Sequence, residues 1–379
     1  MILFPLLAGT MVEGQQPRFQ ISIEQVIPGE GPGYILVRPV DVIPLSNGQV
    51  WVADASDLTI RVFGSDGSYR MAVGRRGQGP GEFRSLRGLG WLADTLYVVD
   101  AENIRASFFD PQGALVREHR LPQLLGGDVF APFRFTPTGI LGTPQLTRDA
   151  FRTASEARFP LILVSFDGGA ADTVAYLDLS GIAVVVNAQG REIMITGHGL
   201  TRLVRPGTPW TISADGRYLL RVERTRGLPV GQDWFLSVVS LRDRQEVRRH
   251  IIPYDPRRVP RDVVDSLYQS MTVHLRGIPE DAALDILRQS LPRPEWYPPV
   301  TRVLASRDGS TFIELGESTP TGMRWSVLGR DGGLVGTFDL PHGIRLETVV
   351  HVSRELWAIR HDDDGVPEIL RLSLRPASN

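Results

Sequence analysis

The segment that decides the fold is QVWVADASDLTIRVFGSDG, residues 49–67, because a similar segment, TLYVVDAENIRASFFDPQG, follows at residues 95–113. Asp54 of the first copy and Asp100 of the second stand 46 residues apart. Each copy holds short strands, rich in valine and aromatic residues, that are separated by turns ending in glycine. Repeats of this length and composition are typical of the blades of a β-propeller.

A linker between the blades recurs as well, since GEGPGY (29–34) matches GQGPGEF (77–83) 48 residues later. The linker lacks the lysine and the strand–loop–helix context of a phosphate-binding P-loop. It is interpreted as a connection that needs glycine conformations and a proline restraint. Further turn-centred units raise the number of predicted blades to six, within residues 39–74, 86–121, 133–169, 210–241, 307–333 and 345–374, with an extra hairpin at 182–196.

The sequence therefore predicts an all-β fold, a six-bladed β-propeller forming a single domain over residues 15–379. We expect the N-terminal strand Phe19–Val26 to add the outer strand of the last blade and close the ring, which removes exposed sheet edges. Apolar residues recur at intervals of three and four within residues 259–291, as on an amphipathic helix. This pattern predicts a helical insertion with a proline-rich connector, residues 256–297, between blades four and five.

The N-terminus contains an apolar run, residues 2–12, that is too short to span a bilayer and is typical of the central part of a secretory signal. Residues 1–14 are predicted to be a signal peptide whose basic start is missing, so that translation would begin upstream. The expected location is the periplasm or the extracellular space. A buried or loose N-terminal strand is the alternative interpretation. No later segment reaches 18 apolar residues, so no transmembrane segment is expected.

Composition excludes several classes of chemistry. The 39 glycines and 28 prolines argue against a helical bundle. The absence of cysteine excludes disulfides and Cys-ligated zinc or iron–sulfur sites. All 41 basic residues are arginines, which excludes Schiff-base catalysis by lysine. The net charge of -2 gives no support for binding of nucleic acid.

The motifs VAD, IRVF, a following Asp-Gly and the linker GQGPGEF together resemble the NHL-type six-bladed propellers, and more closely the exported bacterial propeller proteins of that type. The likeness covers nearly the whole chain after the signal but is sharp only in blades one and two. It implies a platform that binds a ligand or a protein. A minority of such propellers are metal-dependent lactonases or lyases.

Two polar pairs repeat with the blades, Asp54 with Arg61 and Asp100 with Arg105. The Asp and Arg of such a pair could act in catalysis as an acid and an electrophile. An active site, however, occurs once in a chain, whereas these pairs occur twice. They are therefore interpreted as structural devices that tie a blade turn together.

The predicted ligand site is the mouth of the central channel, which the inner strands of the blades line. Arg38, Arg87, Arg134 and Trp210 lie at or near the expected starts of these strands. A ring of arginines with one aromatic side chain suits an anionic or sugar-like ligand.

No catalytic motif is apparent in the sequence. The seven histidines are spread along the chain, so no zinc motif is apparent either, and His198 is the best candidate for a metal ligand in a loop. The run Asp362–Gly365 is interpreted as a charged hairpin tip rather than a calcium loop. No cofactor is predicted. The expected function is a non-catalytic, monomeric propeller of the cell envelope or periplasm that binds a small anionic or sugar-like ligand or an envelope protein. The alternative is a lactonase or lyase that depends on a divalent metal such as calcium or zinc.

Overall fold

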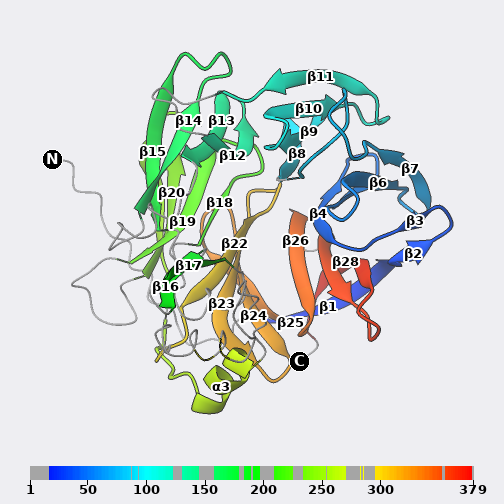
Figure 1. Ribbon diagram of the computed structural model, residues 1–379. Coiled ribbons are helices and arrows are strands. Elements are labelled where there is room, and N and C mark those ends of the chain that lie inside the picture. The colour runs from blue at the N-terminus through cyan, green and yellow to red at the C-terminus, as the bar shows by residue number, and fades with distance from the viewer. Residues whose placement is uncertain are drawn as a thin grey trace.

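Six four-stranded antiparallel sheets lie around a common centre in the computed structural model (Figure 1). The structure describes residues 17–377 except 87, 93, 123–129, 145–157, 179–182, 189–190, 197–208, 225–233, 253, 270–281, 283–284, 286–294 and 352–354. The first strands of most neighbouring sheets contact one another around the centre. The prediction of an all-β, six-bladed propeller is therefore confirmed.

Each blade is one sheet whose strands follow one another along the chain. Blade one contains β4 (Pro39–Pro44), β5 (Val50–Asp54), β6 (Thr59–Phe63) and β7 (Tyr69–Val73). Blade two contains β8 (Gly88–Leu92), β9 (Thr95–Asp100), β10 (Arg105–Phe109) and β11 (Leu115–Arg120). Blade three contains β12 (Phe130–Thr136), β13 (Gly139–Pro144), β14 (Arg158–Val164) and β15 (Ala171–Asp178).

The second half of the ring follows the same order. Blade four contains β18 (Trp210–Ile212), β19 (Tyr218–Arg224), β20 (Trp234–Ser240) and β21 (Glu246–Ile251). Blade five contains β22 (Val300–Ala305), β23 (Thr311–Thr319), β24 (Gly322–Leu328) and β25 (Leu334–Leu340). Blade six contains β26 (Ile344–His351), β27 (Glu355–His361) and β28 (Pro367–Pro376), and β1 (Phe19–Ile27) is its fourth strand.

Strand β1 is antiparallel to the C-terminal strand β28, from Phe19 opposite Pro376 to Ile27 opposite Ile369. The segment just before β1 also reaches blade five, because the amide of Thr337 in β25 donates to the carbonyl of Pro17 at 2.9 Å. The first described residues therefore join the last two blades.

Within the described part of the chain, three smaller elements lie outside the blades. A short hairpin of β2 (Glu30–Gly31) and β3 (Tyr34–Ile35) occupies the first linker, and a second hairpin pairs β16 (Ala183–Ala188) with β17 (Arg191–Thr196). Helix α3 (Arg261–Gln269) follows blade four and buries Val264. Most of the predicted helical pattern after Gln269 lies outside the described residues, so α3 is the helical part of the expected insertion that can be reported.

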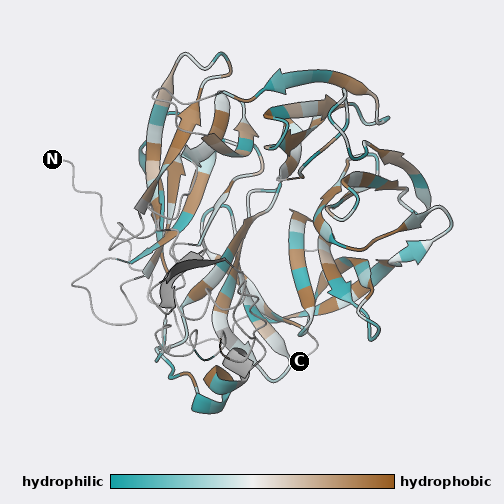
Figure 2. Cartoon of the chain, viewed as in Figure 1, coloured by the Kyte–Doolittle hydropathy of each residue, from teal (hydrophilic) through white to brown (hydrophobic). Residues whose placement is uncertain are grey.

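Hydrophobic clusters fill the interface between every two neighbouring blades. Strand β5 shows how one strand serves two of these clusters. Trp51 packs toward blade two, whereas Val50 and Val52 pack toward blade six. A strand that buries both faces has no polar alternation, which explains its almost continuous apolar sequence. Figure 2 shows hydrophobic residues concentrated along the strands and hydrophilic residues at many turns.

Candidate functional site

The aspartate that ends the second strand of blade one holds the linker that precedes the blade. Asp54 is fully buried, and its carboxylate accepts hydrogen bonds from the amides of Val37 at 2.7 Å and Arg38 at 3.1 Å. The Ser56 hydroxyl donates a third bond at 2.6 Å, and Arg61 lies 3.6 Å away. Burial alone would raise the pKa of Asp54, but these hydrogen bonds, led by Ser56, hold it below its usual value.

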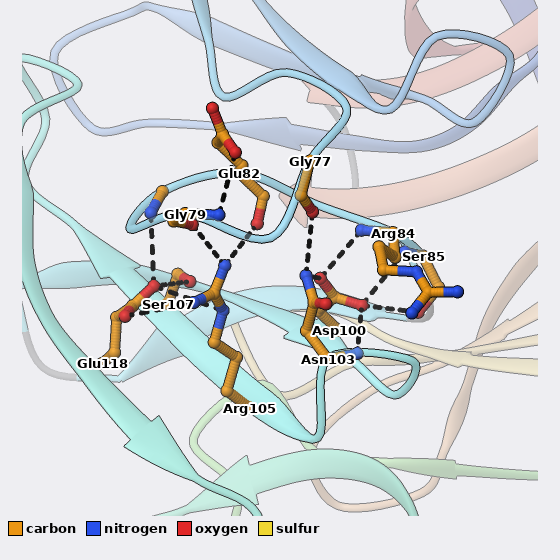
Figure 3. Close-up of polar contacts among 11 residues, drawn as sticks. Gly77, Gly79, Glu82, Arg84, Ser85, Asp100, Asn103, Arg105, Ser107 and Glu118 are labelled. Atoms are coloured by element: carbon orange, nitrogen blue, oxygen red, sulfur yellow. Dashed lines mark hydrogen bonds and ion pairs between the residues drawn. The ribbon is translucent and has the colours of Figure 1, made fainter.

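Asp100 repeats this arrangement in blade two, where it accepts bonds from the amides of Arg84 at 2.9 Å and Ser85 at 3.0 Å (Figure 3). Arg105 is opposite Asp100 in the strand register but forms its ion pair with Glu118, at 3.3 Å. Its guanidinium also donates to the carbonyls of the GQGPGEF linker, one of them that of Glu82 at 2.8 Å. Both members of the second pair therefore hold the linker, each with partners of its own.

A cavity of about 660 Å³ lies at the centre of the ring. It opens among the turns that follow the inner strands, since Ser46 and Asn47 of the β4–β5 turn and Asp94 of the β8–β9 turn line it. Its wall combines apolar side chains with a few charged ones, as ligand pockets do. The apolar residues are Ile43, Leu45, Leu89, Trp91, Ile212, Leu304 and Val349.

Of the five charged side chains that line this cavity, four form an interacting group, namely Asp41, Arg134, Arg307 and Glu347, and the fifth is Asp94. They come from β4, β12, the β22–β23 turn and β26, so the ring assembles them from four blades. Asp41 accepts a hydrogen bond from the Val42 amide at 2.9 Å.

Burial, and secondly the nearby Glu347 carboxylate, raise the pKa of Asp41 to about 7 from the ordinary 3.8. At neutral pH this carboxyl is therefore protonated in a large fraction of molecules and can donate a hydrogen bond. Burial likewise lowers the pKa of Arg307, whose guanidinium donates to the carbonyl of Pro44 at 2.7 Å. Arg134 lies near both Asp41 and Arg307, so the cavity presents carboxyl and guanidinium groups side by side.

Of the four residues predicted at the channel mouth, Arg134 lines the cavity. Arg38 is exposed ahead of β4 and donates to the carbonyl of Ala55 at 3.0 Å, and neither it nor Trp210 is among the lining residues. The Trp210 ring instead packs on Phe133, with centroids 5.4 Å apart. Arg87 lies outside the described residues. The cavity is thus lined by the middle and later parts of the inner strands and by the turns after them, whereas the predicted mouth lay at their starts.

Sequence reasoning missed Asp41, Arg307 and Glu347. Asp41 carried a signal, because it is the acidic residue inside the otherwise apolar strand PVDVIP. Arg307 and Glu347 carried no comparable signal, since arginine and glutamate occur in turns and on strands throughout the chain.

The other candidates of the sequence analysis lie elsewhere. His198 falls outside the described residues. Asp362 accepts hydrogen bonds from the amides of Asp364 and Val366 at 3.1 and 2.8 Å, which makes residues 362–365 a hairpin turn. Within the described ranges, no group of three or more His, Asp or Glu side chains could hold a metal ion. In the same part of the chain, no helix is long and apolar enough to cross a membrane.

Residues 19–130 match a family model described as a 6-bladed beta-propeller, DUF5128. A member of the DUF4221 family from Bacteroides vulgatus has a similar structure, with a TM-score of 0.53 and 13% sequence identity over 96% of this chain and all of that chain. This similarity supports the propeller fold. The search of curated proteins finds no match.

Two more distant structures have TM-scores too low to add to the argument. A protein from Bacteroides fragilis named as a putative exported protein scores 0.44 at 12% identity, covering 94% of this chain and 96% of its own. The virginiamycin B lyase of Staphylococcus aureus scores 0.45 at 10% identity, covering 94% of this chain and all of its own.

Proposed function

We propose that the central cavity binds a small anionic or sugar-like molecule that carries a carboxylate or a comparable anionic group. The observation that carries the proposal is the pair of guanidinium groups, Arg134 and Arg307, on the wall of a 660 Å³ cavity that also holds a carboxyl with a raised pKa. A cavity of this size accommodates a ligand of sugar size.

Each part of the wall has a distinct role in this proposal. The guanidinium groups bind the anionic group through charge-assisted hydrogen bonds. Protonated Asp41 donates to a ligand oxygen, while the Glu347 carboxylate accepts from a ligand hydroxyl. Trp91 and Leu89 provide apolar contact for the ring of the ligand.

The surrounding organisation is part of the same proposal. Residues 1–14 direct export, and residues 15–379 form one NHL-like propeller domain whose ring β1 closes. The region 256–297 is its insertion, and the protein acts as a monomer in the periplasm or outside the cell. The proposed action is binding. The alternative, a metal-dependent lactonase or lyase, would require a set of metal ligands at the cavity.

Binding is tested by isothermal titration calorimetry of the full chain with D-glucuronate, using D-glucose as the uncharged counterpart. We expect wild type to bind glucuronate better than glucose. The double variant Arg134→Met, Arg307→Met removes both charges and should weaken glucuronate binding about tenfold or more.

Arg38→Met is the matched control, because Arg38 is an exposed arginine that does not line the cavity. It should bind glucuronate as wild type does. Equal affinity of wild type and the double variant for glucuronate, or equal binding of glucose and glucuronate by wild type, would contradict the proposed site.

A further inference from the structure

A second hollow, of about 500 Å³, lies between blades four and five and adjoins the central cavity. Ala214, Ala305 and Arg307 line both spaces. We call this second hollow the interblade groove. Because its wall includes residues of the outer strand β21 and of the β24–β25 turn, namely Arg248 and Arg330, it leads from the centre of the ring toward its rim.

The strand register shows how the blade-four wall is built. Leu220 is opposite Thr211 on one side and Val238 on the other, and Val238 is opposite Arg248. One row of side chains therefore crosses all four strands, from Thr211 at the cavity to Arg248 near the rim. Strands in a sheet are spaced about 4.8 Å apart, so the row is about 14 Å long.

The charge of the groove is positive. Arg307 stands at its inner end and Arg248 and Arg330 farther out, while Asp215 is its acidic lining residue and pairs with Arg217 at 3.9 Å. Within the described residues, none of the three arginines forms an ion pair with a carboxylate. Arg307 and Arg330 donate to the backbone carbonyls of Pro44 and Asp308, which are uncharged partners, so the positive charge of the groove remains.

Between the arginines, the floor of the groove is aliphatic. Leu220, Val238 and Val247 line it, and the hydroxyls of Ser213 and Ser310 stand beside them. A floor of this kind suits the apolar side chains and the polar backbone of an extended peptide. A charged oligosaccharide would instead require a more continuous set of hydrogen-bonding groups under its rings.

We propose that the interblade groove binds an acidic peptide in extended form, with the end of the peptide in the central cavity. The peptide's carboxylates pair with Arg248 and Arg330, and its apolar side chains lie over Val238 and Val247. About four extended residues span the row, at about 3.3 Å for each residue. This inference rests on the proposed function, because it takes the cavity to accept the anionic end of the same partner.

The test uses fluorescence anisotropy of a labelled peptide of alternating Glu and Leu with a free C-terminus. Wild type should bind this peptide, and Arg248→Gln with Arg330→Gln should weaken binding about tenfold or more. The matched control is Arg70→Gln with Arg117→Gln, which removes two exposed arginines from the outer strands of blades one and two. The control should change the affinity less than twofold.

Charge reversal guards against a variant that simply fails to fold. Arg248→Glu with Arg330→Glu should lose the Glu-Leu peptide and gain affinity for the corresponding Lys-Leu peptide. Glucuronate binding should be unchanged in every groove variant, because neither Arg248 nor Arg330 lines the central cavity.

Three results would overturn the inference. One is equal weakening by the groove variant and the control, which would indicate nonspecific attraction. Another is that wild type binds glucuronate but not the peptide. This second result would leave the proposed function intact. The third is that binding of a labelled oligogalacturonate depends on Arg248 and Arg330, whereas binding of the peptide does not. If wild type does not bind glucuronate, the proposed function itself is contradicted.

Discussion

Replacing Asp41 by asparagine should change how the stability of the protein depends on pH. The native state holds the Asp41 proton up to about pH 7, whereas the unfolded chain releases it near pH 3.8. Since the native state binds the extra proton between these values, the contribution of Asp41 to stability falls as pH rises from about 4 to about 7. The asparagine side chain of the variant does not titrate, so it would have no such dependence.

The magnitude follows from the two pKa values. Between pH 4.5 and pH 8 the free energy of unfolding of wild type should fall by about 3 kcal/mol relative to that of Asp41→Asn. All other titrating groups are common to both proteins and largely cancel in this difference. The asparagine keeps an oxygen that can accept from the Val42 amide, so the variant should fold.

The assay is urea denaturation of both proteins at four or more pH values, followed by tryptophan fluorescence. Glu347→Gln provides a second check, because removal of the neighbouring carboxylate should lower the pKa of Asp41 and move the transition to lower pH. A difference between wild type and Asp41→Asn that stays constant from pH 4.5 to pH 8 would refute the argument that Asp41 is desolvated in the native ring.

The remaining predictions concern stability. Asp54→Ala should lower the free energy of unfolding by about 3–5 kcal/mol, because it leaves the partly buried amides of Val37, Arg38 and Ser56 without their acceptor, whereas Asp66→Ala in an exposed turn should have a much smaller effect in the same urea assay. Similar losses for both would contradict the role given to Asp54. Gly322→Ala should cost more than about 3 kcal/mol, because a Cβ there would lie 1.9 Å from the carbonyl oxygen of Leu340. Gly365→Ala, also at positive φ but in open space, should cost only about 1 kcal/mol, and equal losses would count against this explanation.

The blade pattern could be predicted because each strand and turn is determined by a short segment of sequence. Strand β5 and the turn at residues 65–67 depend on neighbours within about 20 residues, so their composition is enough to place them. Asp54 and Asp100 could be interpreted as structural for the same reason, since repetition at one period is visible in the sequence.

The cavity could not be predicted, because it depends on the arrangement of the whole ring. Asp41 and Glu347 are 306 positions apart in the sequence, and only the contact of β4 with β26 brings them together. The prediction placed the site at the starts of the inner strands, but local sequence does not say which end of the channel is hollow. Arg134 lines the cavity because it stands in the second half of β12.

The pairing of β1 with β28 has a consequence for the order in which the protein can fold during its synthesis. Ile21 is opposite Leu374, and Ala377 donates its amide to the carbonyl of Arg18 at 2.9 Å. Blades one and two join segments close in sequence and can form while the chain is still growing. Blade six must wait until the ribosome has released the chain as far as β28, about 350 residues after β1, and until then β1 remains an unpaired edge that a chaperone would have to protect.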